Sequence, residues 1–186
     1  MLLEPSNKWY WQYDLAAQSI IIQLSDGLAM SCRLDKCNMN EICKGKVHFT
    51  ADDSSFYYYI IEAIKDLTLS DAQKTQLALN AVTNYRFHKI KMPQSWFFNF
   101  QAEAMRSKVG DLVTLNTADN SFDFIVLESD ERVATCMLIQ AQAQLSYAKC
   151  LQQFEVIRVM NNRVALTPTA QIQSPADILR AMRIQA

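Results

Sequence analysis

Residues 69–98 read LSDAQKTQLALNAVTNYRFHKIKMPQSWFF and separate two parts of the chain with different sequence patterns. Ser70 and Gln73 have the spacing of a capping box, in which each side chain satisfies a backbone N–H that is otherwise unpaired at a helix start. The apolar residues that follow fall on one face at helical spacing: Leu77, Ala78, Ala81, Val82 and Tyr85. Pro93 ends this pattern, because its ring restricts the preceding residue to extended geometry. We therefore expect a capped helix, and a change of structure at the proline.

The composition is that of a folded protein. Of the 186 residues 50% are hydrophobic and 20% are charged, and the net charge is -1, which gives no global attraction to nucleic acid or to an anionic membrane. The apolar runs at residues 20–24 and 56–64 are too short to span a bilayer, and residues 1–14 lack the basic-then-apolar order of a secretory signal. We expect a cytoplasmic protein without a nucleic-acid or membrane partner.

Glycine is scarce, which excludes several nucleotide-binding and catalytic motifs. Only three glycines occur, so the chain has no glycine-rich loop that cradles nucleotide phosphates and no GxSxG nucleophile elbow. The two histidines have no recognisable catalytic partner in the sequence. The paired acids at residues 52–53 and 130–131 lie where helix starts and turns ordinarily place carboxylates. We expect a protein that is not an enzyme, with no catalytic residue and no cofactor.

The five cysteines, an odd number, agree with a reducing compartment in which thiols stay free. Cys32, Cys37, Cys43 and His48 lie near one another in the sequence, but zinc sites favour shorter paired spacings such as CxxC. Free cysteine more often behaves as a small buried hydrophobe. We therefore expect no metal site.

The first part of the chain predicts a small antiparallel sheet. Residues 8–14 alternate in a way that indicates a strand with one aromatic face, whose tryptophans are expected in the core; an exposed one would suit a peptide pocket. Residues 19–24 and 28–34 predict two further strands. Asp26-Gly27 joins them and suits the positive φ of a tight turn.

Residues 56–67, FYYYIIEAIKDL, are compatible with a helix or a strand. The aromatic and β-branched start of this run favours a strand. The acids Asp52 and Asp53 before it favour a helix, because carboxylates complement the dipole at a helix start. We favour the helix, which would form a helical hairpin with the helix that Ser70 caps and complete an α+β module.

After Pro93 the pattern changes to short strands. Apolar or alternating runs separated by turn-forming residues occur at residues 97–100, 111–115, 122–127, 133–139 and 154–160. Gly110-Asp111 resembles the entry to the first strand of a small barrel. We therefore expect a first domain of residues 1–92 with an α+β fold, and a second of residues 93–186 built as a small SH3-like β-barrel.

Two further elements are expected in the second domain. Asn161-Asn162 lies between the apolar runs 157–160 and 163–166, which predicts a hairpin in which both turn residues tolerate positive φ. Ser174-Pro175 predicts a terminal helix with the serine as its cap and the proline in its first turn.

Basic and aromatic side chains gather near the junction. Arg86, Lys89 and Lys91 form a basic cluster, and Arg163 would join it if the second domain packs against this region. The alternative is an ordinary solvated helix end. The run Trp96–Phe98 cannot face one core if it is extended, because alternate residues point to opposite faces, so at least one ring is expected to line a groove or a contact.

Four segments, in this order, resemble the ZapC family of bacterial cell-division proteins: WYWQYD at residues 9–14, LSDAQKTQLALNAV at 69–82, MPQSWFF at 92–98 and IRVMNNR at 157–163. MPxSW after a capped helix is the most specific of them. The resemblance implies a cytoplasmic, non-enzymatic protein of two domains, which we expect to be a monomer. It also implies direct binding to polymers of the tubulin-like division GTPase FtsZ, lateral association of FtsZ protofilaments and suppression of the GTPase activity.

The resemblance also assigns a partner-binding surface. The basic groove of the family corresponds to Lys89 before MPxSW and to Arg163 after Asn161-Asn162. Family members carry a basic residue within MPxSW where this chain has Gln94, and Lys91 places a charge nearby. The expected partner-binding residues are Lys89, Lys91, Trp96 and Arg163. The alternative function is a nucleic-acid or small-ligand binding module on the barrel, although the near-zero net charge disfavours nucleic acid.

Overall fold

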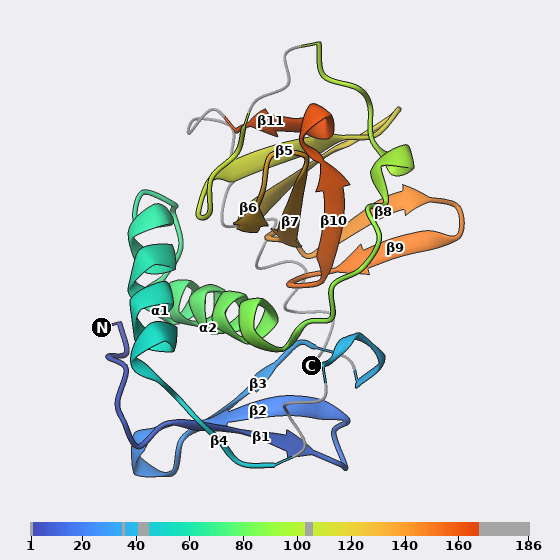
Figure 1. The fold of residues 1–186 in the computed structure, drawn as a ribbon. Coiled ribbons are helices and arrows are strands. Elements are labelled where there is room, and N and C mark those ends of the chain that lie inside the picture. Colours follow the sequence, from blue (N-terminus) through green and yellow to red (C-terminus); the bar gives the residue numbers. More distant parts are fainter. Residues whose placement is uncertain (1, 35, 41–44, 103–105, 168–186) are drawn as a thin grey trace. The chain divides into compact units, whose positions relative to one another are not determined.

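The computed structural model has an α+β fold and describes residues 2–34, 36–40, 45–102 and 106–167. The chain forms two compact units (Figure 1). The first comprises Met1–Lys65 with Ser70–Ile90, and the second comprises Asp66–Leu69 with Lys91–Ala186. The α+β class is thus confirmed, whereas a division into folding domains at residues 92 and 93 stays a prediction.

The first unit contains a four-stranded antiparallel sheet in the order β3-β2-β1-β4. Its strands are β1 (Tyr10–Asp14), β2 (Ser19–Gln23), β3 (Ala29–Cys32) and β4 (Val47–His48). Gly27 has a φ of 76° in the turn between β2 and β3, a conformation that residues with a Cβ rarely adopt. The predicted three strands are confirmed. The sequence did not predict β4, which has only two residues.

Two helices, α1 (Ala51–Ala63) and α2 (Asp71–Phe87), lie on the same side of this sheet (Figure 1). Both begin with a capping box, formed by Thr50 and Asp53 in α1 and by Ser70 and Gln73 in α2. The helix predicted for the FYYYII run is therefore confirmed, because its cap outweighs the β propensity of the aromatic residues. No helix in the described ranges is long and apolar enough to cross a membrane.

The aromatic side chains of β1 belong to the core of the first unit. Trp9 and Trp11 are 2% and 0% exposed. The Trp11 ring stacks on Phe49 with 4.8 Å between centroids, and its Nε1 donates a hydrogen bond to Thr83 Oγ1 at 3.1 Å. Neither tryptophan is therefore exposed at a peptide pocket.

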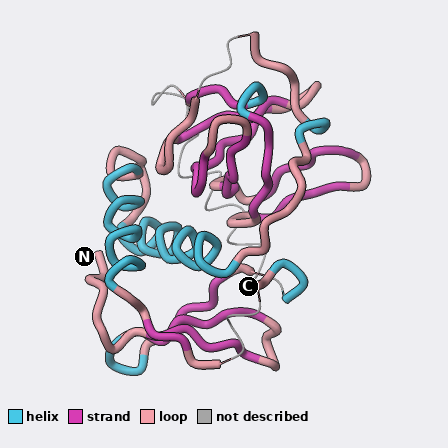
Figure 2. Tube along the Cα trace, viewed as in Figure 1, coloured by secondary structure: helices cyan, strands magenta, loops and turns pink. Residues whose placement is uncertain are grey.

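The second unit consists almost entirely of strands and loops (Figure 2). Its main sheet has five antiparallel strands in the order β10-β7-β6-β5-β11, and β8 and β9 form a separate two-stranded ribbon. The strands are β5 (Leu112–Asn116), β6 (Ser121–Ser129), β7 (Val133–Leu138), β8 (Gln142–Ser146), β9 (Lys149–Gln152), β10 (Val156–Met160) and β11 (Val164–Leu166).

Three expectations for the second unit differ from the structure. The SH3-like barrel is not confirmed, because β10 and β11 form opposite edges of the sheet and do not pair. The hairpin at Asn161-Asn162 is wrong, since residues 161–163 form a 3-10 helix, η5, that leads from one edge to the other. The strand at 97–100 is also wrong, because Ser95–Phe97 forms a second 3-10 helix, η4. The terminal helix predicted at Ser174 lies outside the described residues.

The failure of the predicted hairpin has a local cause. Asn161 donates from its backbone N–H to the carbonyl of Arg132 at 2.9 Å, and from Nδ2 to the carbonyl of Asp130 at 2.9 Å. Both acceptors belong to the turn between β6 and β7. These bonds hold the end of β10 against that turn, so the chain cannot fold back on β10 itself.

Asp123 is a buried carboxyl group in the main sheet. It accepts hydrogen bonds from Thr114 Oγ1 at 3.0 Å and from Gln140 Nε2 at 3.3 Å. Burial raises its pKa above the ordinary value, although the bond from Thr114 acts in the opposite direction. The ionised form is therefore disfavoured by the fold.

An Asp123→Asn variant is expected to gain stability relative to the native protein as the pH rises from about 4 to 7. The raised folded-state pKa means that the stability associated with Asp123 is fully present below its unfolded pKa and is lost as the pH rises through the folded one. Urea unfolding at several pH values measures the free energy of unfolding of both proteins. All other titratable groups are the same in the two proteins, so their contributions cancel in the difference. A difference that is constant over this range would contradict the assignment.

Candidate protein-binding surface

Residues 91–101, here named the strap, contain η4 but no strand and follow the outer edge of β10. The backbone N–H of Gln94 donates to the carbonyl of Arg158 at 2.7 Å. In return, the backbone N–H of Met160 donates to Ser95 Oγ at 2.7 Å. These bonds attach the first half of the strap to the sheet and satisfy part of an edge that would otherwise be open.

The second half of the strap is attached to other elements. Asn99 donates from its backbone N–H to the carbonyl of Asn116 and from Nδ2 to the carbonyl of Thr117, both at 2.7 Å. The backbone N–H of Gln101 donates to the carbonyl of Asn162 at 2.8 Å. The strap is thus held at both ends by the β5–β6 turn, β10 and η5.

The large apolar side chains of the strap divide between the core and solvent. Phe98 is 3% exposed and packs edge-to-face with Phe124, with 6.4 Å between ring centroids. Trp96 and Phe100 are 70% and 63% exposed. Since Phe98 fixes the segment in the core, the strap presents two aromatic rings to solvent on a defined backbone.

Two arginines of the second unit contact the strap. Arg158 bonds the carbonyl of Lys91 at 3.5 Å and pairs with Asp130 at 3.6 Å. The backbone N–H groups of Arg132 and Val133 are the main cause of the lowered pKa of Asp130, which keeps this carboxylate ionised beside Arg158.

Arg163 contacts the strap from η5. Its Nη1 donates to the carbonyl of Phe98 at 3.1 Å, and its guanidinium carbon lies 5.5 Å from the centre of the Phe100 ring. Among the described residues no carboxylate pairs with this side chain. Its positive charge therefore remains uncompensated next to an exposed aromatic ring.

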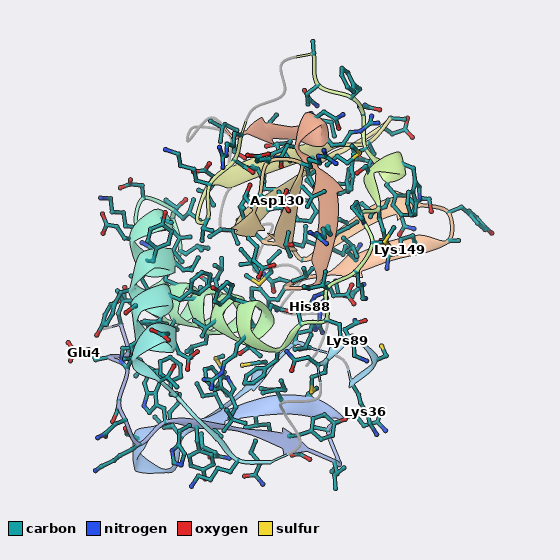
Figure 3. The ribbon with its side chains drawn as sticks, viewed as in Figure 1. Glu4, Lys36, His88, Lys89, Asp130 and Lys149 are labelled. Atoms are coloured by element: carbon teal, nitrogen blue, oxygen red, sulfur yellow. The ribbon has the colours of Figure 1, made fainter. Side chains whose placement is uncertain are left out.

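The four residues predicted to bind a partner lie in different units. Lys91, Trp96 and Arg163 belong to the second unit, where the strap and η5 carry them. Lys89 belongs to the first unit and follows the end of α2 (Figure 3). Its backbone N–H donates to the carbonyl of Asn38 at 2.7 Å, and its side chain is exposed.

Arg86 does not belong to an exposed basic cluster, contrary to the sequence-based expectation. Its guanidinium forms an ion pair with Asp53, whose side chain is 7% exposed, and donates to the carbonyl of His48 at 3.0 Å. It also lies over the Trp11 ring, 5.1 Å from its centre. Arg86 therefore joins the end of α2 to the start of α1 and is not free to bind a partner.

Phe100 and Arg158 are surface residues that the sequence did not identify. Phe100 was predicted to end a strand at residues 97–100, because this stretch is a short, mostly apolar run. The run of consecutive aromatics predicted that at least one ring would not face the core, and Trp96 is exposed. Strand alternation does not explain which ring this is, because Trp96 and Phe98 would share a face of an extended segment, whereas the segment contains η4 and of these two rings only Phe98 is buried. Nothing in the sequence distinguished Arg158 from an ordinary charged residue of an edge strand.

The cysteines do not form a metal site in the part of the chain that the structure describes. No group of three potential ligands from histidine, cysteine, aspartate and glutamate gathers there. Cys43, considered above with Cys32 and Cys37, lies outside the described residues. Cys136 is fully buried, and burial raises the pKa of its thiol to about 12, so it is not a nucleophile.

Two family models match the chain in succession. One, for the N-terminal part of the cell-division protein ZapC, matches residues 2–89, and one for its C-terminal part matches residues 91–170.

Full-length relatives show the same similarity. The cell division protein ZapC of Aeromonas hydrophila is 32% identical over 173 residues, 93% of this chain and 97% of the relative. The proteins of the same name from Photobacterium profundum and Aliivibrio salmonicida are 34% and 35% identical, each over 88% of this chain and 92% of the relative.

Proposed function

Because this chain belongs to the ZapC family of cell-division proteins, we propose that it binds FtsZ polymers directly through Lys89, Lys91, Trp96 and Arg163. In this proposal the protein is a cytoplasmic monomer without enzymatic activity. It promotes association between FtsZ protofilaments, stabilises the polymer and thereby suppresses the GTPase activity of FtsZ.

The observation that carries the proposal is the strap. Its exposed Trp96 is held on a backbone that is hydrogen-bonded at both ends, so binding does not require ordering of this segment. Tryptophan and arginine are the residue types that contribute most often to protein interfaces. The unpaired charge of Arg163 suits an acidic partner surface that also offers apolar contacts.

A polymeric partner makes a weak contact sufficient. Each filament repeats the binding site many times, so a protein that joins filaments is retained by avidity even when one contact has only modest affinity. A monomer that joins two filaments needs two contact surfaces, whereas a self-associating one needs only one.

A barrel-like curvature of the second domain, residues 93–186, is part of the proposal. Four strand spacings of about 4.8 Å separate β10 from β11 in a flat sheet, roughly 19 Å. The link from Met160 to Val164 extends at most about 14 Å. The sheet must therefore curl, which favours an SH3-like arrangement with residues 1–92 as a separate α+β domain.

Replacement of Lys89 and Arg163 by aspartate is expected to abolish co-sedimentation with FtsZ polymers, because it reverses two charges of the proposed surface. The matched control is Lys8→Asp with Lys108→Asp, which changes the net charge equally at exposed positions elsewhere. Circular dichroism verifies that both variants are folded. If the Lys89 and Arg163 variant pellets like the control, these residues are not in the interface.

Ionic strength gives a second measure of the same contact. An electrostatic surface should lose affinity as salt rises from about 0.05 to 0.3 M, because the Debye length becomes comparable to the spacing of the charges. Binding that does not respond to salt would assign the interaction to the aromatic residues instead. A filter-binding assay with single-stranded oligonucleotides tests the alternative nucleic-acid function.

A further inference from the structure

We infer that Arg163 acts as a positioning residue that orients the strap, and that Phe100 is a partner-binding side chain in addition to Trp96. The inference rests on the proposed function of this surface. It assigns to Arg163 a task that its charge alone would not predict, because the side chain is directed at the strap rather than away from it.

The contacts of Arg163 fix one peptide group. Nη1 donates to the carbonyl of Phe98 at 3.1 Å, and the N–H of the same peptide, which belongs to Asn99, donates to the carbonyl of Asn116 at 2.7 Å. The peptide plane between Phe98 and Asn99 is therefore held from both sides. This plane joins Phe98, whose side chain is in the core, to Asn99, and Phe100, whose side chain is exposed, follows directly. Fixing the plane therefore restricts the backbone path from which the Phe100 side chain leaves.

The rest of the Arg163 side chain also contacts the protein. Its Nε is buried and has no hydrogen-bond partner among the described residues, so this part of the guanidinium is enclosed by the protein. The guanidinium carbon lies 5.5 Å from the centre of the Phe100 ring, within the range of a cation–π contact. A directed hydrogen bond and a flat group beside a ring are properties of arginine that lysine does not share.

Arg163→Lys separates the positioning role from a purely electrostatic one. The substitution keeps the positive charge but removes the planar guanidinium. We expect about a tenfold loss of affinity for FtsZ polymers in the pelleting assay, with an unchanged dependence of the affinity on salt. Retention of native affinity by Arg163→Lys would overturn the inference, because it would show that charge is sufficient.

Amide hydrogen exchange tests the positioning role without any partner. In Arg163→Lys the amides of Asn99 and Gln101 should exchange about ten times faster than in the native protein. The amide of Val126 in β6 should not change, because it donates to the carbonyl of Asp111, just before β5, and not to the strap. Unchanged exchange at Asn99 and Gln101 would overturn the inference. Faster exchange in a protein that never binds FtsZ would instead contradict the proposed function alone.

A double-mutant comparison tests whether Arg163 acts through Phe100. Phe100→Ala should weaken pelleting about tenfold with little effect on folding, since the ring is largely exposed. The combination of Phe100→Ala with Arg163→Lys should weaken it little further, because both changes remove the same oriented ring. Additive losses would show that Arg163 and Phe100 act independently and would overturn the inference.

Discussion

Arg86→Ala is expected to lower the free energy of unfolding of the first unit by about 3 kcal/mol, because it leaves the buried Asp53 carboxylate without its cation. The loss should lie at the low end of the range for buried pairs. The Thr50 hydroxyl and backbone N–H continue to donate to Asp53 at 2.7 and 2.6 Å. The variant also removes a side chain packed over the Trp11 ring.

Tryptophan fluorescence during urea unfolding measures this effect. Trp9 and Trp11 are buried in the first unit and should report its unfolding, whereas Trp96 is already 70% exposed. Lys65→Ala is the matched control in the same unit, because its partner Glu62 is more than half exposed and its loss should matter much less. Equal unfolding midpoints for Arg86→Ala and Lys65→Ala would refute the structural role assigned to Arg86.

Phe98→Ala is expected to destabilise the second unit by about 3–5 kcal/mol, the usual cost of removing a buried phenylalanine and leaving a cavity. The ring belongs to the core cluster that also contains Phe124, Leu115 and Val159. Its loss would also free the strap from the core. We therefore expect weaker binding to FtsZ polymers in addition to a lower unfolding midpoint.

Trp96→Ala provides the contrast within the same strap. Its ring is exposed, so the unfolding midpoint should change little, while binding to FtsZ polymers should fall more than tenfold if Trp96 is an interface residue. Thermal unfolding followed by circular dichroism, together with pelleting, distinguishes the two variants. A Phe98→Ala protein as stable as Trp96→Ala would show that the strap is not anchored through Phe98.

The local signals of the first unit were sufficient for most of its fold. The capping box at Ser70 and the acids Asp52 and Asp53 are short-range patterns, because a helix start needs partners only within one turn. The role of Arg86 could not be predicted from a local pattern. Its position in the last turn of α2 suggested a solvated charge, and only the ion pair with Asp53 from α1 makes it part of the structure.

Long-range pairing limited the prediction for the second unit. The strands β5, β6, β7 and β10 were predicted from their apolar patterns, but the ribbon of β8 and β9 was missed because its alanine and glutamine residues carry little β propensity. The Asn161-Asn162 turn had the composition of a hairpin. Its true geometry depends on bonds from Asn161 to the distant β6–β7 turn, which no local pattern encodes.

Among the predicted site residues, neither the exposure of Trp96 nor the contact of Arg163 followed from a local pattern. Alternation in an extended segment would place Trp96 and Phe98 on one face, but residues 95–97 form η4, and Trp96 is exposed while Phe98 is buried. The hydrogen bond from Arg163 to the carbonyl of Phe98 joins residues that are far apart in the chain. The contribution of Arg163 to the strap therefore becomes visible only in the three-dimensional structure.

The pairing of β11 with β5 bears on how the protein folds during synthesis. Val164 of β11 lies opposite Leu115 of β5. The outer edge of β5 is therefore covered only by one of the last described segments of the chain. Contacts this distant in sequence slow folding, because the intervening chain must first be ordered. On the ribosome the first unit can therefore fold early, while the second keeps an open strand edge until residues 164–166 emerge.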